Sequence, residues 1–523
     1  MPSLERKWWT LIAVCTAIFM LLLDITVVNV ALPDIQRSLN SSFSDLQWVV
    51  DAYSLMLAAI LLTAGVVGDI YGRREVFAIG LGVFSLSSLT CGLAVNSLML
   101  NISRATQGVG GAIMFATSFA LVAEAFQGRE RGTAFGIVGA MTGGAVAVGP
   151  LVGGAITSGI GWRWIFFVNV PIGVLGIFVT LTKMAKSSGV RARRIDTVGF
   201  VSFSLSLFAL VFALVRGNDD GWSSPTIVGF LVAAGVLMVV FLVNELRTKD
   251  PMLALGLFRK TTFDGASVVA FCIAASIFAM FLYLTLYIQD DLGFGPFPAG
   301  LRFLPLTMLA FAVAPVAGRL TVRMASNYLL GTGMLLIAAG LLLMSRTHPN
   351  SAWTVLLPGF VVCGFGIGMV NPVLASASVS VVEPKDSGMA SGSNNTFRQV
   401  GIACGIAVLG AIFQSQIVSH TTSVLAQTPV GKLVLQHGGG QLTAALSAGQ
   451  VQAVLAHASL PASARSTLLH AYHVGFSVTL NHLMEIAAVV AFVGCLAGYF
   501  LIRQRDFVVS GAAPAPAAVA AHA

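Results

Sequence analysis

Apolar segments long enough to cross a lipid bilayer recur along almost the whole chain. A membrane-spanning helix needs ~20 apolar residues at about 1.5 Å rise each, and fourteen segments approach or exceed this length. Hydrophobic residues make up 56% of the 523 residues and charged residues only 10%, well below the ~25% of soluble domains. The sequence therefore predicts an all-α, polytopic membrane protein with 14 transmembrane helices, at about 8–30, 46–67, 76–95, 98–123, 133–156, 164–182, 198–215, 226–244, 264–288, 300–317, 329–345, 354–377, 397–415 and 478–502.

The basic residues predict how these helices are oriented. With the N-terminus placed inside, twenty of the 29 Lys and Arg residues fall in cytoplasmic segments, six in outer segments and three within or at the edges of helices. This bias follows the positive-inside rule for an even number of spans with both termini cytoplasmic. The segment 8–30 is too long for a cleavable signal peptide and no small-residue cleavage site follows it, so we expect it to be the first span. The formal charge of +8 reflects topology and gives no reason to expect a nucleic-acid partner.

Two basic stretches, 183–194 and 247–260, bracket the seventh and eighth apolar segments. We therefore expect an N-terminal six-helix bundle over 1–182, a two-helix insert with basic cytoplasmic linkers over 183–262, and a C-terminal six-helix bundle over 263–502. The last bundle includes a long external loop at 416–477. Residues 503–523 form an Ala/Pro-rich cytoplasmic tail that is predicted to be disordered.

Asp24 lies inside the first apolar segment, where a carboxylate costs at least ~2.5–3.5 kcal/mol and is a functional candidate by default. It lies about seven residues, ~10 Å, from the outer end of its helix, and Arg104 lies about six residues, ~9 Å, from the outer end of the fourth helix. The two charges can therefore meet at one depth. Movement between states would then switch the protonation of Asp24. A static structural ion pair is the alternative.

Glu485 is the second embedded acid that we single out, one helical turn from His482 in the last apolar segment. It is a candidate for a second proton or cation site, or else part of a packing network. The loop 416–477 carries five histidines, of which His470 and His473 form a weak pair, so we expect a solvated, partly helical loop with no metal site. The six cysteines all fall in apolar segments and are predicted to be core residues, neither disulfides nor metal ligands.

Several ordered motifs support a common interpretation. The loop after the second helix reads GVVGDIYGRR at 65–74, the fourth helix begins RATQGVG at 104–110, and the fifth carries GAMTG at 139–143 and GPLVGG at 149–154. Further along the chain come GWRWIFFVNVPIG at 161–173, YLTLYIQ at 283–289, PAGL at 298–301 and RQVG at 398–401. Together these motifs resemble the major facilitator superfamily, specifically its fourteen-helix drug:proton antiporter branch, over essentially residues 8–502. Ile70 departs from the family pattern, because a basic residue usually follows Asp69.

The resemblance assigns roles to two of these motifs. In the loop after the second helix, Gly72 permits a tight turn, and Asp69, Arg73 and Arg74 are charges that can pair with each other and with helix ends. The resemblance implies a conformational latch made of these residues and Gly65; simple topology anchors are the alternative. On the fifth helix, small residues allow close helix packing and a proline favours a kink. Either plain packing or an antiporter seal would use these positions, namely Gly139, Gly143, Gly149, Pro150, Gly153 and Gly154.

The resemblance also implies a central cavity lined by the helices at 8–30, 98–123, 264–288 and 354–377. The candidates there are aromatic and amide residues that suit loose recognition of lipophilic molecules, namely Asn29, Gln107, Phe278, Tyr283, Tyr287 and Asn371. No phosphate loop or nucleophile motif is present in the sequence, so we expect neither an enzyme nor ATP-driven transport by this chain alone.

These features predict a secondary transporter in a bacterial plasma (inner) membrane. It would export hydrophobic or amphiphilic compounds, such as drugs and toxic metabolites, in exchange for protons by alternating access. The expected partners are small lipophilic substrates, protons and membrane lipids; we expect a monomer with no cofactor and the proton gradient as energy source. The alternatives are a lipid or lipid-like metabolite translocator without proton coupling, and a non-transporting membrane sensor.

Overall fold

The protein is described from a computed structural model that covers residues 5–126, 128–186, 196–248, 251, 253, 255–321, 323–349, 351–382, 387–436, 446 and 461–507. Within these residues every regular element is helical. Thirteen helices are long and apolar enough to span a membrane, and the two parts of a bent helix, Phe43–Leu61 and Thr63–Tyr71, together make a fourteenth span. The prediction of an all-α membrane protein is confirmed, and each of the fourteen apolar segments corresponds to one helical span.

The first six spans use seven helices. They are α1 (Arg6–Leu39), α2 (Phe43–Tyr71), α3 (Arg73–Gly92), α4 (Ser97–Ala125), α5 (Gly128–Gly159), and the short α6 (Trp164–Phe167) followed by α7 (Asn169–Lys183). Two further helices follow, α8 (Thr197–Asp220) and α9 (Pro225–Arg247).

The remaining spans are less regular. One of them, Thr261–Asp291, is built from α10 (Thr261–Ile273), a π-helical turn η2 (Ala274–Phe278), α11 (Ala279–Leu286) and a second π-helical turn η3 (Tyr287–Asp291). The others are α12 (Pro296–Leu320), α13 (Ser326–Met344), α14 (Leu357–Ser380) preceded by η4 (Trp353–Leu356), α15 (Ser387–Leu425) and α18 (Ala462–Leu501). The short 3₁₀ turns η1 (Leu255–Arg259) and η6 (Gln504–Asp506) flank this part.

Local chemistry explains several helix ends. Ser42 and Asp45 form a reciprocal capping box at the start of α2, and the side chain of Asn96 accepts from Met99 N at the start of α4. Gly72 joins α2 to α3 with a positive φ of 99°, a conformation that favours glycine. The turn predicted from the sequence at this position is therefore present.

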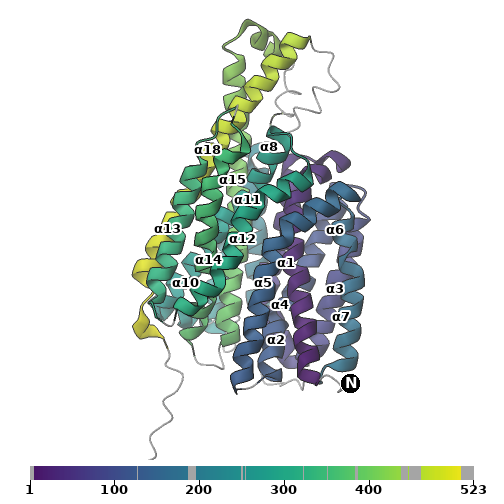
Figure 1. The fold of residues 1–523 in the computed structure, drawn as a ribbon, viewed down its shortest axis with the longest axis vertical. Helices are drawn as coiled ribbons and strands as arrows, with labels where there is room; N and C mark the ends of the chain where they lie inside the picture. Colours follow the sequence, from purple (N-terminus) through teal and green to yellow (C-terminus); the bar gives the residue numbers. More distant parts are fainter. Residues whose placement is uncertain are drawn as a thin grey trace, which may run out of the picture.

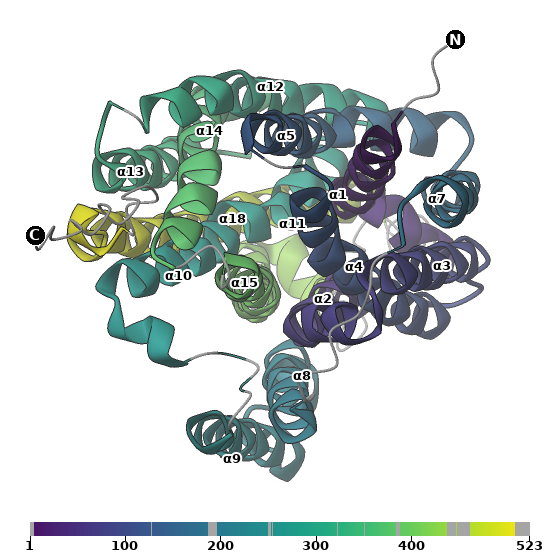
Figure 2. The ribbon, with the colours of Figure 1, turned by 90° about the horizontal axis from the view of Figure 1, so that it is seen from below.

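Two groups of helices lie side by side, as Figure 2 shows along the helix axes. The helices α1 to α7 form one group, and α10 to α18 form the other. They meet along two seams, where α5 packs against α12 and α2 packs against α15. The helices α8 and α9 lie at the periphery, where α8 touches both α2 and α15.

The two ends of the molecule differ. We call the end where α1 begins the near end and the opposite end the far end (Figure 1). Four hydrogen bonds between described residues join the two groups at or beyond the middle of their helices, toward the far end. They run from Gln47 Nε2 to Ile406 O (3.0 Å), from Gln289 Nε2 to Val30 O (2.7 Å), from Phe297 N to Ser158 Oγ (3.0 Å) and from Gln414 Nε2 to Ser44 Oγ (3.4 Å).

The helices at the end of the chain are longer than the apolar pattern predicts. The segments 397–415 and 478–502 become α15 (Ser387–Leu425) and α18 (Ala462–Leu501), and their ends project together beyond the other helices at the far end (Figure 1). Much of the predicted loop 416–477 is therefore helical where it is described. Hydropathy marks only the apolar part of a helix, whereas residues such as Ala and Gln continue it into water at little cost.

Candidate functional site

Asp24 is held in the interior of the first group of helices by three hydrogen-bond donors. It is 3% exposed. Its carboxylate accepts from Arg104 Nη1 at 2.5 Å, from Gln107 Nε2 at 3.0 Å and from Asn169 Nδ2 at 3.2 Å. These donors come from α4 and from the start of α7, so the carboxylate of α1 ties three spans together. A carboxylate with a guanidinium and two amides around it has the partners that a buried charge requires.

Arg104 extends this cluster to α2. Its Nε donates to the backbone oxygen of Val49 at 3.0 Å, and its Nη1 also donates to Gln107 Oε1 at 2.8 Å. The guanidinium lies 4.3 Å from the centre of the Tyr53 ring, a favourable cation–π distance. One fully buried cation therefore contacts α1, α2 and α4, and it lies at the same depth as Asp24, as the sequence predicts.

Asn169 links the cluster to α3. Its Nδ2 donates to Ser88 Oγ at 3.1 Å as well as to Asp24, and the hydroxyl of Ser88 donates to Phe166 O at 2.8 Å. The sequence analysis did not single out Asn169 as a site residue, although it lies within the motif at 161–173. An asparagine flanked by valines inside an apolar segment is the feature by which it could have been found.

The residues predicted to line the cavity fall into two groups. Asn29, Phe278 and Asn371 are half-buried, and the Phe278 ring lies 4.7 Å from the guanidinium carbon of Arg398. Gln107, Tyr283 and Tyr287 are instead buried. Gln107 belongs to the Asp24 cluster, and Tyr283 donates its hydroxyl to Ile406 O at 2.7 Å.

The charges after α2 contact each other and a neighbouring helix end. Arg73 Nε donates to Asp69 Oδ1 at 2.9 Å, and Arg73 Nη1 lies 3.4 Å from Glu124 Oε2. Arg74 Nε donates to Thr180 O at 2.9 Å, near the end of α7. These contacts all lie within the first group of helices. Gly65 faces open space, since a Cβ placed on it would meet no atom within 4 Å.

The glycines of α5 lie at two close helix contacts. A Cβ on Gly153 would fall 2.9 Å from Val27 Cα of α1, and one on Gly154 would fall 2.5 Å from Pro296 O at the start of α12. A Cβ on Gly149 would fall closer still to the Thr26 side chain, and Pro150 lies against Gly300 of α12. Gly143 faces the ring of Phe311, whereas a Cβ on Gly139 would meet no atom within 4 Å. The positions 149–154 therefore form the tight part of this motif.

Glu485 lies apart from the Asp24 cluster, on an exposed face of α18. One turn away, His482 Nδ1 lies 3.1 Å from Gln416 Oε1, and the rings of His420 and His482 are 5.7 Å apart. His473 Nδ1 lies 2.7 Å from Asp291 Oδ1 at the far end of the Thr261–Asp291 span. His437 and His457 lie outside the described residues. Within those residues, no group of three or more His, Cys, Asp or Glu side chains could hold a metal ion.

Asp51 of α2 is a buried acid that the sequence analysis did not consider. Its exposed fraction is 0%, and neither carboxyl oxygen has a hydrogen-bond partner among the described residues. It lies within the predicted segment 46–67, so the argument that singled out Asp24 applies to it as well. None of the motifs that carry the family resemblance contains this position, which is why the motifs did not draw attention to it.

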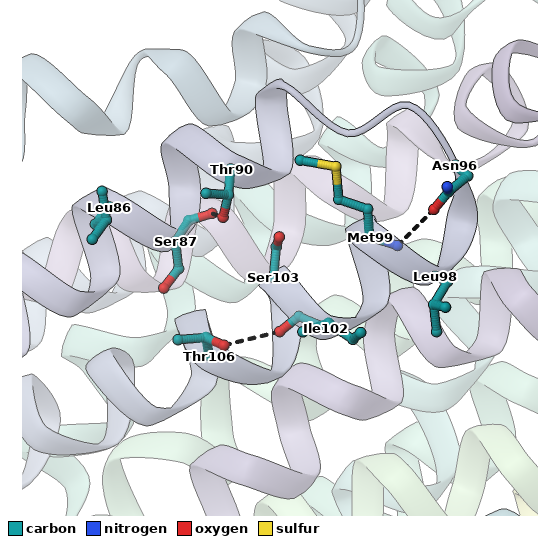
Figure 3. Close-up of a pocket in the computed structure, with 9 residues that line it drawn as sticks. All are labelled: Leu86, Ser87, Thr90, Asn96, Leu98, Met99, Ile102, Ser103 and Thr106. Atoms are coloured by element: carbon teal, nitrogen blue, oxygen red, sulfur yellow. Dashed lines mark hydrogen bonds between the residues drawn. The ribbon is translucent and has the colours of Figure 1, made fainter.

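A groove of about 560 Å³ lies between the far ends of α3 and α4 (Figure 3). Hydroxyl groups and leucines share its lining, which comprises Leu86, Ser87, Thr90, Asn96, Leu98, Met99, Ile102, Ser103 and Thr106. Thr106 Oγ1 donates to Ile102 O and Asn96 Oδ1 accepts from Met99 N, so part of this polarity is satisfied locally. None of the residues predicted for the site lines this groove.

The chain matches a known family over most of its length. A family model described as the Major Facilitator Superfamily matches residues 14–406. The multidrug resistance protein Stp of Mycobacterium tuberculosis (strain CDC 1551 / Oshkosh) is 36% identical over 77% of this chain and 75% of its own length. The tetracenomycin C resistance and export protein of Streptomyces glaucescens is 31% identical over 95% of this chain and 91% of its own.

A solved structure has a similar fold. It is that of a bacterial homolog to the human lysosomal transporter Spinster, in an inward-facing and occupied conformation, with a TM-score of 0.60. The match covers 97% of this chain and 100% of the other at 17% identity. At this level of identity the similarity concerns the fold alone.

Proposed function

Because the chain belongs to the Major Facilitator Superfamily, we propose that it is a secondary active transporter that exports hydrophobic or amphiphilic compounds in exchange for protons. The observation that carries the proposal is the buried Asp24–Arg104 pair, a titratable group held by several helices at once. The relatives named for multidrug resistance and for tetracenomycin C export support the choice of cargo.

The orientation follows from the distribution of basic residues. With the near end in the cytoplasm of a bacterial cell and the far end outside, both termini are cytoplasmic, and the Lys and Arg bias obeys the positive-inside rule. The two groups of helices then correspond to moving bundles at 1–182 and 263–502, with 183–262 as a peripheral insert. The hydrogen bonds between the groups lie toward the far end, so this state is closed to the outside.

Proton binding takes place at Asp24 in this proposal. The ionised carboxylate is stabilised by Arg104, Gln107 and Asn169. A proton on one carboxyl oxygen removes the charge that holds the guanidinium and weakens that hydrogen bond, because bonds between charged partners are roughly twice as strong as neutral ones. The protonated and ionised forms therefore favour different arrangements of α1, α4 and α7.

Arg104 passes this change on to α2. It is bonded to Val49 O and stacked on Tyr53, both on α2, and α2 packs against α15 of the other group. A shift of the guanidinium therefore acts on one of the two seams that close the far end. This contact gives proton binding a physical route to the switch between inward-facing and outward-facing states.

Substrate binding is assigned to the space between the groups, at the half-buried residues Asn29, Phe278 and Asn371. Aromatic and amide groups recognise amphiphilic molecules through apolar contact with few fixed hydrogen bonds. Gln107, Tyr283 and Tyr287 are buried in this state, so they join such a site only if the bundles move. The latch at Asp69, Arg73 and Arg74 and the seal at 149–154 are assigned to switching.

A variant of Asp24 tests the proposal. In cells that accumulate ethidium, Asp24→Asn is expected to abolish extrusion against a gradient, while the protein is still produced and elutes as a single species in detergent. Asp45→Asn is the matched control, because Asp45 is an acid in the capping box at the far end of α2, outside the cluster, and it is expected to retain extrusion. Full extrusion by the Asp24→Asn variant would remove this residue from the mechanism.

A further inference from the structure

Asp51 is a fully buried carboxyl group with no part in the function proposed above. Burial removes its hydration, and no donor among the described residues replaces the lost water. An ionised carboxylate is strongly disfavoured in such surroundings. The neutral, protonated form of Asp51 is the one that such surroundings favour.

A polar group one helical turn away on α2 has a matching deficit. Gln47 lies one helical turn toward the far end, and its Oε1 is also a buried acceptor without a donor in the described part of the chain. Its Nε2 is already used by Ile406 O, at 3.0 Å across the α2–α15 seam. Acceptors that lack a donor thus lie one turn apart, and a protonated Asp51 would bring an O–H donor to this part of α2.

The groups facing Asp51 belong to the other group of helices. Tyr283 of α11 and Cys404 of α15 both lie within electrostatic range of its carboxyl. The hydroxyl of Tyr283 donates to Ile406 O at 2.7 Å, the same oxygen that accepts from Gln47. Asp51 therefore lies in the seam between α2 and α15 and not inside one bundle.

The charges on the other helices around α2 have partners of their own. Arg104 of α4 and Asp24 of α1 bind each other. At the far end of α8, Arg216 pairs with Asp220 at 2.8 Å, and Asp219 accepts from the hydroxyl of Ser44. Arg73 of α3 pairs with Asp69 at the near end, and Arg398 of α15 stacks on Phe278. No ion pair or hydrogen bond in the described residues compensates an anion at Asp51.

We propose that Asp51 is a second proton-binding site and that its protonation from water at the far end permits α2 and α15 to close there. When the seam opens, Asp51 meets water and ionises; when a proton binds one carboxyl oxygen, the neutral group can be buried again. The proton returns to the side from which it came. It therefore controls which state is occupied without adding to the number of protons exchanged for each substrate.

Cross-linking across the seam tests this inference. Ser44 and Gln414 face each other at the far end, 3.4 Å apart between Oγ and Nε2. A Ser44→Cys/Gln414→Cys protein is oxidised with copper phenanthroline in acidic and in alkaline buffer, and the disulfide-linked peptide is quantified by mass spectrometry. We expect a severalfold lower yield in alkaline buffer, because ionised Asp51 opens the seam. A lower yield in alkaline buffer cannot come from the thiol chemistry, because thiol oxidation itself is faster in alkali.

Changes at Asp51 decide the outcome. In the same double-cysteine protein, Asp51→Asn is expected to give a high yield in both buffers, because the amide cannot ionise. Asp51→Ser, a second neutral variant, should also give a high disulfide yield in both buffers. Asp45→Asn on the same helix should still give a lower yield in alkaline buffer. An Asp51→Asn protein with the unaltered pH dependence, or a parent protein with none, would overturn the inference.

The seam measurement is made without substrate, so it is independent of transport. The assignment of the far end to the cell exterior rests on the proposed function, but the pH response of the seam does not. A seam controlled by Asp51 in a protein that moves ethidium without protons would refute the proposed function and support this inference. If the protein exchanges ethidium for protons but the cross-linking yield across the seam does not change with pH, the proposed function is supported and this inference is refuted.

Discussion

At the scale of single residues, the question is how charges are kept inside apolar helices. The sequence indicates Asp24 and Arg104 because each interrupts an apolar segment, and the depth of the two residues suggests that they meet. The structure adds the amides of Gln107 and Asn169, which complete the coordination of the carboxylate. Which amides reach the carboxylate depends on which faces of α4 and α7 point toward α1. Packing between the helices sets these faces, and the apolar pattern of a single helix does not predict them.

The buried pair makes a prediction about stability. Arg104→Gln leaves the Asp24 carboxylate buried without its cation, and we expect it to lower the free energy of unfolding by about 3–5 kcal/mol, the usual cost of breaking a buried pair. The double variant Asp24→Asn/Arg104→Gln should lose less than the sum of the two single variants. Unfolding in detergent, followed by tryptophan fluorescence, measures all four proteins.

Additive losses in that cycle would mean that the two side chains do not interact, since non-additivity is what direct contact produces.

Asp51 shows the limit of reasoning from motifs at this scale. It occupies an apolar segment just as Asp24 does, but its significance comes from the absence of a partner on α11 and α15, which only the three-dimensional arrangement reveals.

At the scale of elements, the number of spans and their order follow from hydropathy, because each apolar segment must cross the membrane as a helix. The π-helical turns η2 and η3 do not follow from it. The residues of η2 are as apolar as their surroundings, and the polar residues of η3 are equally compatible with an α-helical end. The projection of α15 and α18 beyond the membrane part was underestimated for a related reason, since hydropathy ends before the helix does.

The packing of α5 predicts different effects for two glycines of one helix. A Cβ at Gly154 would fall 2.5 Å from Pro296 O, whereas one at Gly139 would meet nothing within 4 Å. Gly154→Ala is therefore expected to hold the α5–α12 seam apart and to reduce ethidium extrusion severalfold, while Gly139→Ala leaves it near the parent rate. The initial rates of extrusion, normalised to protein in the membrane, measure both.

Equal rates for the two alanine variants would show that the α5–α12 contact is not part of the transport cycle. A loss at Gly139 alone would point to a contact made only in another state. Both glycines occur in the motif recognised from the sequence, but the sequence does not distinguish them. The difference comes from the surroundings of each position, since only Gly154 lies against backbone atoms of α12.

At the scale of the whole molecule, the arrangement joins two functions in one architecture. The Asp24 cluster lies within the first group of helices, and Asp51 lies in the seam between the groups. In the mechanism proposed above, the first binds a proton and moves α2 through Arg104, and the second permits the seam to close when it is protonated. The family and the fold were predictable because ordered motifs and fourteen spans constrain both, whereas the state of the seams depends on contacts between residues far apart in the chain.

Proton exchange for substrate is the central claim, and a flux measurement in proteoliposomes tests it most directly. With a pH-sensitive dye in the lumen and no pre-existing pH gradient, an imposed gradient of ethidium should drive a lumenal pH change of the sign that antiport requires. The Asp24→Asn protein should produce none. Substrate movement by the parent protein without any proton flux would contradict the account.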